Sequence, residues 1–376
     1  IDQLEFVYPG SRVSQRMPIG TLEAIEAANA AKLRAFWERE YVPSDTVMIV
    51  VGDIDPAMVE ARIVEHFADW QPVETADQPG AGPVDPARSG ETDIYVDPAL
   101  TETVTLVMND PYIDRPNTRV EALKGLLRSI GSSALGRRLQ SLQRAEDPPF
   151  RSAGFSSNGF LEAAQSITLG VATEEGQWRR GLDTALDEYR SALRFGFTQA
   201  EIDEQVSNLR NRFERTAASE ETRNNAYFVG SALAIVRGDE VPVGPSAQLA
   251  LFEAFADRIT PESVLAEMRE TYRDFDDPLI RFTGKSAPDG GADALRAATR
   301  QALARELQPR ELAATAEFAY TDFGEPGAVV EDGLTGGELG IRTIRFANNV
   351  VLNLKQTALS EDRVAVRVAI DGGDML

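Results

Sequence analysis

The chain has 376 residues, of which 43% are hydrophobic, and its 60 acidic and 38 basic side chains give a formal net charge of −22. This length allows two or three domains with a large core, and the acidic excess argues against nucleic acid and anionic membranes, which bind clustered Lys and Arg. The lack of cysteine excludes disulfides, thiol catalysis and Cys-ligated metals. No apolar run approaches the roughly 20 residues of a membrane-spanning helix, so no membrane insertion is expected.

After a short helix or loop at the start, residues 21–41 repeat apolar side chains at helical spacing. Pro43 ends that helix because the residue before a proline avoids the α region. The apolar run Val47–Val51 is too short for a helix and predicts a strand buried on both faces. Asp55 is predicted to cap a second helix, with Pro56 in its first turn. The predicted unit is therefore helix, buried strand, acidic turn and helix.

A linker rich in Pro, Gly and Ala then leads into a segment with the pattern of a complete module. Its strands are predicted at 94–96, 103–108, 153–158 and 166–172, and its helices at about 118–129, 177–194, 199–217 and 222–236. The small residues of Gly131–Leu139 predict a turn that feeds a further helix ending near Arg144.

The helix-strand-turn-helix unit occurs again over residues 259–303, with Gly284 matching Gly52. The two strands that open the module also have counterparts near the end of the chain, at 352–355 and 363–368. Such long-period similarity indicates a duplicated domain. Because the chain starts without methionine and stops where a sheet would be half built, we expect it to be an interior part of a longer protein.

The repeat and the linkers predict five segments. They are the end of a first domain (1–75), a linker (76–90), a complete second domain (91–310), a connector (311–340) and the first strands of a third domain (341–376). Hairpin strands without regular βαβ alternation predict an α+β fold, in which helices pack on one face of a mainly antiparallel sheet.

Few residues in the sequence suggest catalysis or metal binding. The single histidine, His66, lies beside an apolar helical stripe and is interpreted as a surface or boundary residue, since a catalytic zinc site normally uses two histidines. Ser132 and Ser133 lie in a small-residue stretch that does not match the G-x-S-x-G nucleophile elbow. The sequence alone therefore predicts neither a catalytic residue nor a metal ligand in this chain.

Two charged or glycine-rich stretches have alternative readings. Asp289, Gly290, Gly291 and Asp293 resemble a cation loop only superficially and predict a loop with a helix cap. A second group of charges is interpreted as a solvated helix face, with a peptide-contacting wall as the alternative. It comprises Arg210, Arg212, Arg215, Glu220 and Glu221.

Three segments resemble the pitrilysin/insulinase family of zinc metallopeptidases, whose zinc motif is an inverted H-x-x-E-H. Residues 16–70 show the family's succession of a Pro-Ile-Gly turn, a helix ending in Tyr-x-Pro, an apolar strand closed by Gly-Asp and a helix ending in Phe-x-x-Trp. Residues 131–160 resemble its middle-domain signature but carry Gln143-Arg144-Ala145-Glu146 where Arg-Glu is usual. Residues 323–357 resemble the connector and opening strands of the second half.

The resemblance implies four homologous α+β domains that close around an unfolded peptide and a parent protein that hydrolyses peptides with zinc-activated water. The family's zinc ligands and general base lie upstream of the part matched here. The resemblance therefore gives this chain no catalytic or metal-binding residue, leaves its substrate-binding residues open, and implies a chain inactive by itself. The expected partners are a peptide or unfolded polypeptide and the rest of its own chain.

Two alternatives remain open: a homologue that lost zinc and serves as a scaffold or partner subunit, and a non-enzymatic peptide-binding module that favours basic peptides. The cellular compartment is not determined by the sequence, although the resemblance favours a periplasmic or other extracytoplasmic location.

Overall fold

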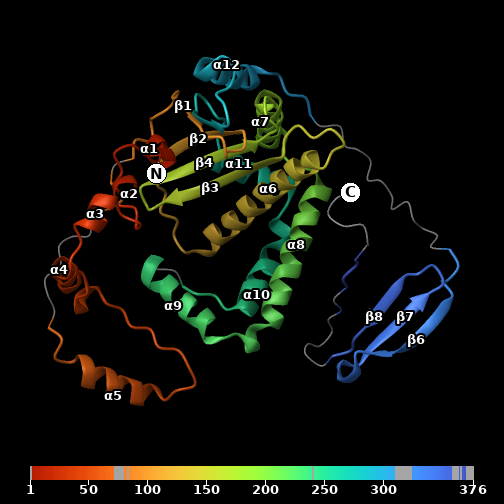
Figure 1. The fold of residues 1–376 in the computed structure, drawn as a ribbon, viewed down its shortest axis with the longest axis horizontal. Coiled ribbons are helices and arrows are strands. Elements are labelled where there is room, and N and C mark those ends of the chain that lie inside the picture. The colour runs from red at the N-terminus through yellow and green to blue at the C-terminus, as the bar shows by residue number, and fades with distance from the viewer. Residues whose placement is uncertain are drawn as a thin grey trace. The chain divides into compact units, whose positions relative to one another are not determined.

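The computed structural model describes residues 2–71, 80–82, 84–238, 241–309, 324–357, 364 and 366–369. The chain divides into two compact units, Ile1–Arg310 and Glu311–Leu376. Residues 92–304 of the first unit contain one sheet with its helices, and this part carries the main hydrophobic core (Figure 1).

The first unit contains a five-stranded sheet with the order β1-β5-β2-β4-β3. Its strands are β1 (Thr92–Val96), β2 (Thr103–Pro111), β3 (Ser152–Phe160), β4 (Ala164–Ala172) and β5 (Leu279–Gly284). β1 runs parallel to β5, and the other neighbours are antiparallel. The predicted mainly antiparallel sheet is therefore confirmed, and the order of the strands shows that β3 lies at one edge.

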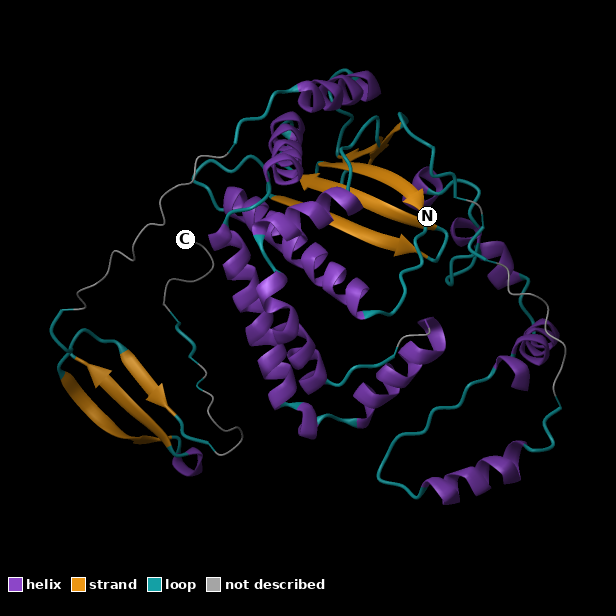
Figure 2. Cartoon of the chain, turned by 180° about the vertical axis from the view of Figure 1, so that it is seen from behind, coloured by secondary structure: helices purple, strands orange, loops and turns teal. Residues whose placement is uncertain are grey.

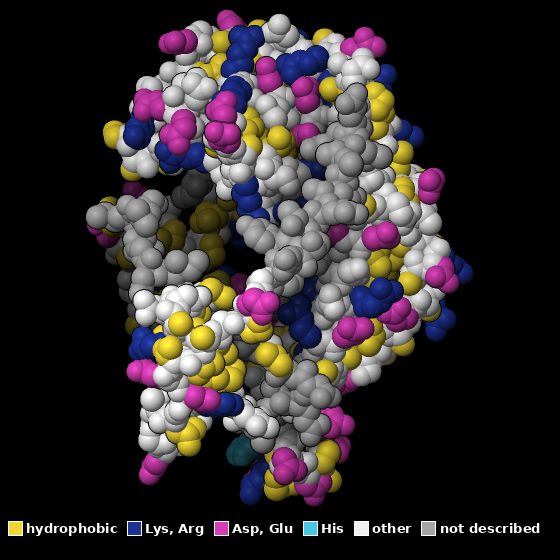
Figure 3. Space-filling view, turned by 90° about the vertical axis from the view of Figure 1, so that its right-hand side faces the viewer, with side chains coloured by type: hydrophobic (Ala, Val, Ile, Leu, Met, Phe, Trp, Pro, Cys, Tyr) yellow, Lys and Arg dark blue, Asp and Glu magenta, His cyan; other side chains and the backbone are white. Residues whose placement is uncertain are grey.

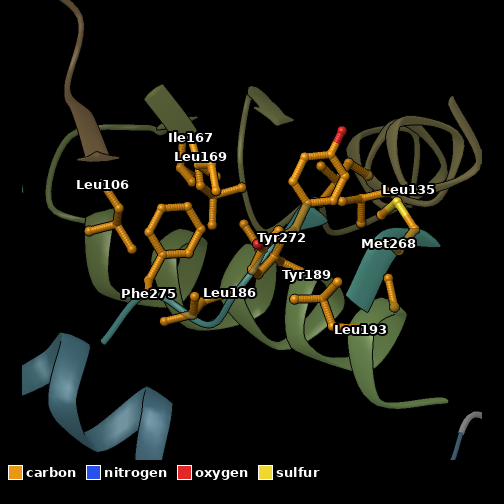
Figure 4. Close-up of a cluster of buried hydrophobic side chains, with 14 of the residues drawn as sticks. Leu106, Leu135, Ile167, Leu169, Leu186, Tyr189, Leu193, Met268, Tyr272 and Phe275 are labelled. Carbon is orange, nitrogen blue, oxygen red and sulfur yellow. The ribbon is translucent and has the colours of Figure 1, made fainter. Parts of the chain in front are cut away.

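The helices that build the core are α6 (Arg119–Gln143), α7 (Trp178–Phe195), α11 (Pro261–Thr271) and α12 (Gly291–Ala304). They lie on one side of the sheet, as the view from behind in Figure 2 shows. Apolar side chains alternate along β2 and β4, so one side of each strand faces these helices. The cluster in Figure 4 includes Leu106, Leu135, Ile167, Leu169, Leu186, Tyr189, Leu193, Met268, Tyr272 and Phe275.

A second group of helices extends from this core. It consists of α8 (Gln199–Ala218), α9 (Asn225–Gly238) and α10 (Pro245–Phe255), with the short 3-10 turns η2 (Glu220–Thr222) and η3 (Ala256–Arg258). Thr198 and Glu201 form a capping box that starts α8. The helix α10 was not predicted from the sequence, although Gly244-Pro245 and the apolar spacing that follows are typical of a helix start.

The turn predicted for Gly131–Leu139 was wrong, because α6 continues through it. A Cβ atom at Gly131 would lie 2.5 Å from the sulfur of Met268 and 2.8 Å from its Cγ, so the glycine allows α11 to approach α6 closely. A glycine in a sequence can indicate a close approach of two helices as well as a turn, and the structure distinguishes between the two.

The beginning of the chain packs on the opposite side of the sheet. α1 (Asp2–Val7) and α2 (Arg12–Gln15) are followed along the chain by the segment with the repeated unit. The ring of Tyr8 stacks on Phe160 with 3.8 Å between the centroids. Its hydroxyl lies 2.5 Å from Ser166 Oγ, which donates to Asn109 Oδ1, and the Asn109 amide donates to the carbonyl of Val7. This buried polar chain fixes residues 7 and 8 to the sheet.

Residues 21–70 form α3 (Leu22–Glu26), α4 (Ala30–Glu40), the turn η1 (Pro43–Asp45) and α5 (Pro56–Phe67). Asp55 caps α5 through the amide of Ala57, as predicted. The predicted strand Val47–Val51 was wrong: these residues are irregular and Val47, Met48 and Val50 are exposed. Its counterpart β5 is hydrogen-bonded between two strands, whereas no described strand pairs with residues 47–51. A strand requires such neighbours.

The second unit contains an antiparallel three-stranded sheet of β6 (Val329–Thr335), β7 (Ile341–Phe346) and β8 (Val351–Leu354), with the turn η4 (Gly337–Leu339). β6 and η4 fall within residues 311–340, which were predicted as a connector. The strand predicted at 363–368 lies partly outside the described residues, and Val364, Val366 and Val368 are exposed and irregular. The prediction was therefore wrong for these valines, because no described strand pairs with them.

Candidate functional site

The residues that the sequence singled out do not converge on one site. His66 lies exposed on α5, with its ring edge toward Phe67. Ser132 and Ser133 lie within α6 rather than in an exposed turn, so the geometry of a nucleophile elbow is absent there. Gly290 has a left-handed backbone that begins α12, and Asp293 pairs with Arg296 in its first turn, so this stretch is a helix start as predicted.

The charged residues of α8 and η2 divide into two groups. Arg210 pairs with Glu253 of α10, and Glu220 accepts hydrogen bonds from the amide and hydroxyl of Ser246. These contacts hold α8 against α10. Arg212, Arg215 and Glu221 are exposed, which matches a solvated helix face.

The residues present do not fit a zinc centre. The sequence has one histidine and no cysteine. Among the described residues, no three or more His, Asp or Glu side chains are placed so that they could hold a metal ion. Within the same residues, no helix is long and apolar enough to cross a membrane.

The free edge of β3 is the best candidate for a binding site in the described part of the chain. β3 pairs with β4 along its whole length, and no described strand pairs with its other side. In an antiparallel ladder, alternate residues direct their N–H and C=O groups away from the neighbouring strand. Ser152, Gly154, Ser156 and Asn158 are exposed and small or polar, so their side chains leave this edge accessible.

A hollow lies at the end of β3, and we name it the β3-end pocket. Its volume is about 880 Å³. It lies between the segment that follows β2, the start of α6, the β3–β4 hairpin and the region of α9. It is lined by several apolar and aromatic side chains, among them Tyr112, Ile113, Tyr227, Val241 and Val243, together with Gly159 of β3.

Glu121 is one of the charged residues that line the β3-end pocket, together with Asp114 and Arg115. Burial alone would raise the pKa of Glu121, but hydrogen bonds and the charges of Arg128 and Arg115 outweigh it and hold this pKa below its usual value. The carboxylate accepts from both guanidinium groups, and Arg128 also pairs with Glu267. Glu121 is therefore ionised and neutralised at neutral pH.

A second hollow lies at the beginning of β3, and we name it the β3-start pocket. Its volume is about 380 Å³, and it lies between α6 and α8 beside Ala153. Its lining is polar and includes Gln140, Gln143, Glu204 and Asn208. Arg137 pairs with Glu204 there at 3.0 Å. The free edge of β3 thus runs between a polar hollow and one that is lined by both polar and apolar side chains.

The free edge of β3 and its two pockets were not predicted from the sequence. Strands 153–158 and 166–172 were predicted, but the order of strands in the sheet decides which edge is free. The residues that line the two pockets lie far apart in the chain. Only the alternation of residue types along β3 indicated that this strand is partly exposed.

Several proteins to which this chain is similar are described as peptidases or proteases. Residues 27–209 match the model described as the peptidase M16 inactive domain. The chain is 22% identical to the chloroplastic stromal processing peptidase of Arabidopsis thaliana, over 98% of the chain and 36% of that protein. It is 21% identical to the probable zinc protease PqqL of Escherichia coli, over 98% of the chain and 40% of that protein. The chain thus spans well under half the length of these relatives.

Solved structures show the same fold. The periplasmic protease PqqL from Escherichia coli superposes with a TM-score of 0.69 and 17% identity, over 96% of this chain and 40% of that one. The ferredoxin protease FusC, solved in complex with Arabidopsis ferredoxin, gives a TM-score of 0.66 and 20% identity, over 93% of this chain and 39% of that one. The α+β architecture is therefore that of clamshell protease domains.

Proposed function

Because this chain belongs to the M16 (pitrilysin/insulinase) family of peptidases, we propose that it is part of a zinc-dependent peptidase and binds an extended stretch of the substrate along the free edge of β3. The open edge of β3, flanked by two hollows, is the observation that carries this proposal. Backbone hydrogen bonds to a sheet edge are made by any sequence in extended conformation, which suits an unfolded polypeptide as ligand.

The catalytic zinc of the parent protein would be held outside this chain, since the sequence has one histidine and no cysteine and the described residues hold no group of donors that fits the metal. The chain would then supply the end of a first domain (1–75), a linker (76–90), a complete second domain (91–310), a connector (311–340) and the start of a third domain (341–376). By itself it would hydrolyse no peptide. A relative of this chain is named as a probable zinc protease, and this supports zinc as the metal of the parent protein.

The helices α4 and α11 support the assignment of the segment that contains α4 to a separate domain, whereas Val7 and Tyr8 pack on the sheet of the second domain. Both have eleven residues, a side-chain N-cap (Asn29 and Thr260) and a tyrosine C-cap (Tyr41 and Tyr272). In α11, Val264 and Met268 are 0% exposed against the core of the second domain.

The matching positions of α4, counted from the caps, are Leu33 and Trp37, which are 63% and 56% exposed. These apolar side chains would be covered by the sheet and helices of the first domain, in the way that α6 and α7 cover α11.

The proposed pairing with β3 can be tested with backbone-methylated peptides. An extended seven-residue peptide labelled with a fluorophore is titrated with the full chain and followed by anisotropy. Because only alternate residues hydrogen-bond to a strand edge, N-methyl groups at odd positions and at even positions have different effects. We expect one series to bind at least 10-fold more weakly and the other to bind like the unmodified peptide. Equal effects of both series, or no binding at all, would refute pairing at the edge.

A homologue without zinc that serves as a scaffold or partner subunit is the second candidate. The two hypotheses predict different properties for the parent protein. An intact H-x-x-E-H motif and zinc-dependent peptide hydrolysis there would support the peptidase. The periplasmic location of the Escherichia coli protease PqqL favours an extracytoplasmic compartment for the parent.

A further inference from the structure

The β3-end pocket is positioned to receive a side chain from a peptide bound along β3. Phe155 faces the helix layer, where its ring lies 5.2 Å from that of Tyr189 and 5.0 Å from that of Tyr272. Side chains alternate along a strand, so position 159, four residues later, faces the same side. A residue opposite Gly159 in an added strand would point its side chain to this side too, because directly opposed residues share a face.

Gly159 lines the pocket and places no side chain between the strand and the ring of Tyr112. A Cβ atom at this position would lie 3.4 Å from the ring of Tyr112, so the ring lies directly over the end of the strand. Gln165, which is paired with Gly159, donates its amide to Ser157 Oγ and so is held along the hairpin. The strand end and the Tyr112 ring thus form adjoining walls of the hollow.

The lining is mixed, and its large apolar side chains are left uncovered by the rest of the described chain. Tyr112, Ile113 and Val241 are substantially exposed although they are large apolar residues, and they lie around one hollow. The carboxylate of Glu121 is already paired with Arg115 and Arg128, so it attracts a cationic side chain only weakly. The hollow falls within the size range of small-ligand sites, roughly 300–1,000 Å³, and accommodates the largest side chains.

We infer that the β3-end pocket is a specificity pocket that takes a large apolar or aromatic side chain of the extended peptide. This inference rests on the proposed function. The β3-start pocket, beside Ala153, is polar by contrast, and about six residues at roughly 3.4 Å each separate the two. A peptide of seven or more residues spans both, so the preference for an apolar side chain is confined to one end of the peptide.

The test compares labelled seven-residue peptides that differ at one position, with the full chain and anisotropy as readout. Phe, Ala or Lys is placed at the first or the seventh residue, because the direction of the peptide is not fixed by the edge. We expect Phe at one of these ends to bind 10- to 100-fold more tightly than Ala, which corresponds to burying one such side chain. Lys at that end should bind no better than Ala.

Variants of the protein complete the test. Tyr112→Ala should reduce the preference for Phe over Ala to less than about 3-fold, and a difference between the two N-methyl series that persists in this variant reports an intact edge. Gly159→Leu should fill the entrance and have the same effect. Gly154→Ala is the matched control, since it lies on the same strand with no atom within 4 Å of the added Cβ, and it should keep the full preference.

The two proposals fail in distinguishable ways. Equal binding of the Phe and Ala peptides at both ends, or a full preference in Tyr112→Ala, would overturn the pocket and leave pairing with β3 standing. No binding of any peptide would overturn the proposed function and the pocket with it.

Discussion

At the scale of single residues, two glycines of α6 have opposite roles. Gly131 lies against Met268 and Val264 of α11, whereas Gly136 has no atom within 4 Å of its added Cβ. Alanine favours a helix over glycine by about 1 kcal/mol, but overpacking a core costs roughly 1–3 kcal/mol.

We therefore expect Gly131→Ala to lower the free energy of unfolding by about 1–2 kcal/mol and Gly136→Ala to raise it by up to about 1 kcal/mol. Urea unfolding followed by circular dichroism measures both. Equal and stabilising effects of the two changes would show that α11 does not lie close to Gly131.

The pair of Arg138 and Glu201 makes stability depend on pH. Arg138 Nε lies 2.6 Å from one carboxylate oxygen of Glu201, and its Nη2 lies 2.9 Å from the other. Burial alone would raise the pKa of Glu201, but the hydrogen bonds and charge of Arg138, with hydrogen bonds from Thr198, hold this pKa below its usual value of 4.5. A lowered pKa in the folded state gives stability above the unfolded pKa and loses it as the pH falls through the folded one.

Replacement of Glu201 by Gln should therefore cost about 2–4 kcal/mol of unfolding free energy at pH 7, because Arg138 is left buried without its counter-charge. The difference between the two proteins should shrink as the pH falls from about 5 toward 3. Unfolding in urea at a series of pH values measures it. A difference that stayed constant over this range would contradict the electrostatic origin of the effect.

At the scale of elements, the sequence predicted what local patterns determine. The spacing in 177–194 predicted α7, whose buried face is continuous, and Asp55-Pro56 predicted the start of α5. Prediction from the sequence failed where residues distant in the chain determine the structure. Val47–Val51 has the composition of a buried strand but no described neighbouring strand, and Gly131 allows a close contact between two helices. The free edge of β3 depends on the order of five strands, which no single stretch encodes.

The two copies of the repeated unit should therefore exchange backbone hydrogens at very different rates. The amides of β5 lie in the sheet between β1 and β2, whereas residues 47–51 are irregular. We expect peptides that cover 47–51 to exchange within seconds and those that cover 279–284 to be protected for hours, because exchange requires the hydrogen bond to open. Mass spectrometry after deuterium labelling measures this. Comparable protection of both would show that residues 47–51 pair with another strand in solution.

At the scale of the whole molecule, the net charge of −22 is spread over a surface that also carries many basic residues. Figure 3 shows acidic, basic and apolar side chains interspersed on the face it draws. Many arginines are paired with carboxylates, such as Arg151 with Glu174 and Arg180 with Asp147. Exposed pairs of this kind contribute little stability, so the stability of the chain is expected to come mainly from the core of the second domain.

The two units should therefore contribute very unequally to stability. Among the described residues of β6, β7 and β8, Ile344 is the one that is buried, at 9% exposure. A three-stranded sheet that buries so little apolar surface is not independently stable, because backbone pairing alone does not offset the entropy of ordering the chain. We expect removal of Glu311–Leu376 to leave the midpoint of urea unfolding unchanged within error.

The shortened chain, residues 1–310, is compared with the full chain by circular dichroism and by tryptophan fluorescence, to which Trp178, buried in α7, contributes. Leu186→Ala, a core change made in both, should lower both midpoints equally, since about 2–5 kcal/mol is lost when a buried leucine is truncated. A clearly lower midpoint for the shortened chain would mean that the second unit buries surface against the first in solution. Stability would then belong to the two units jointly, as it does in proteins whose domains share an extensive apolar interface.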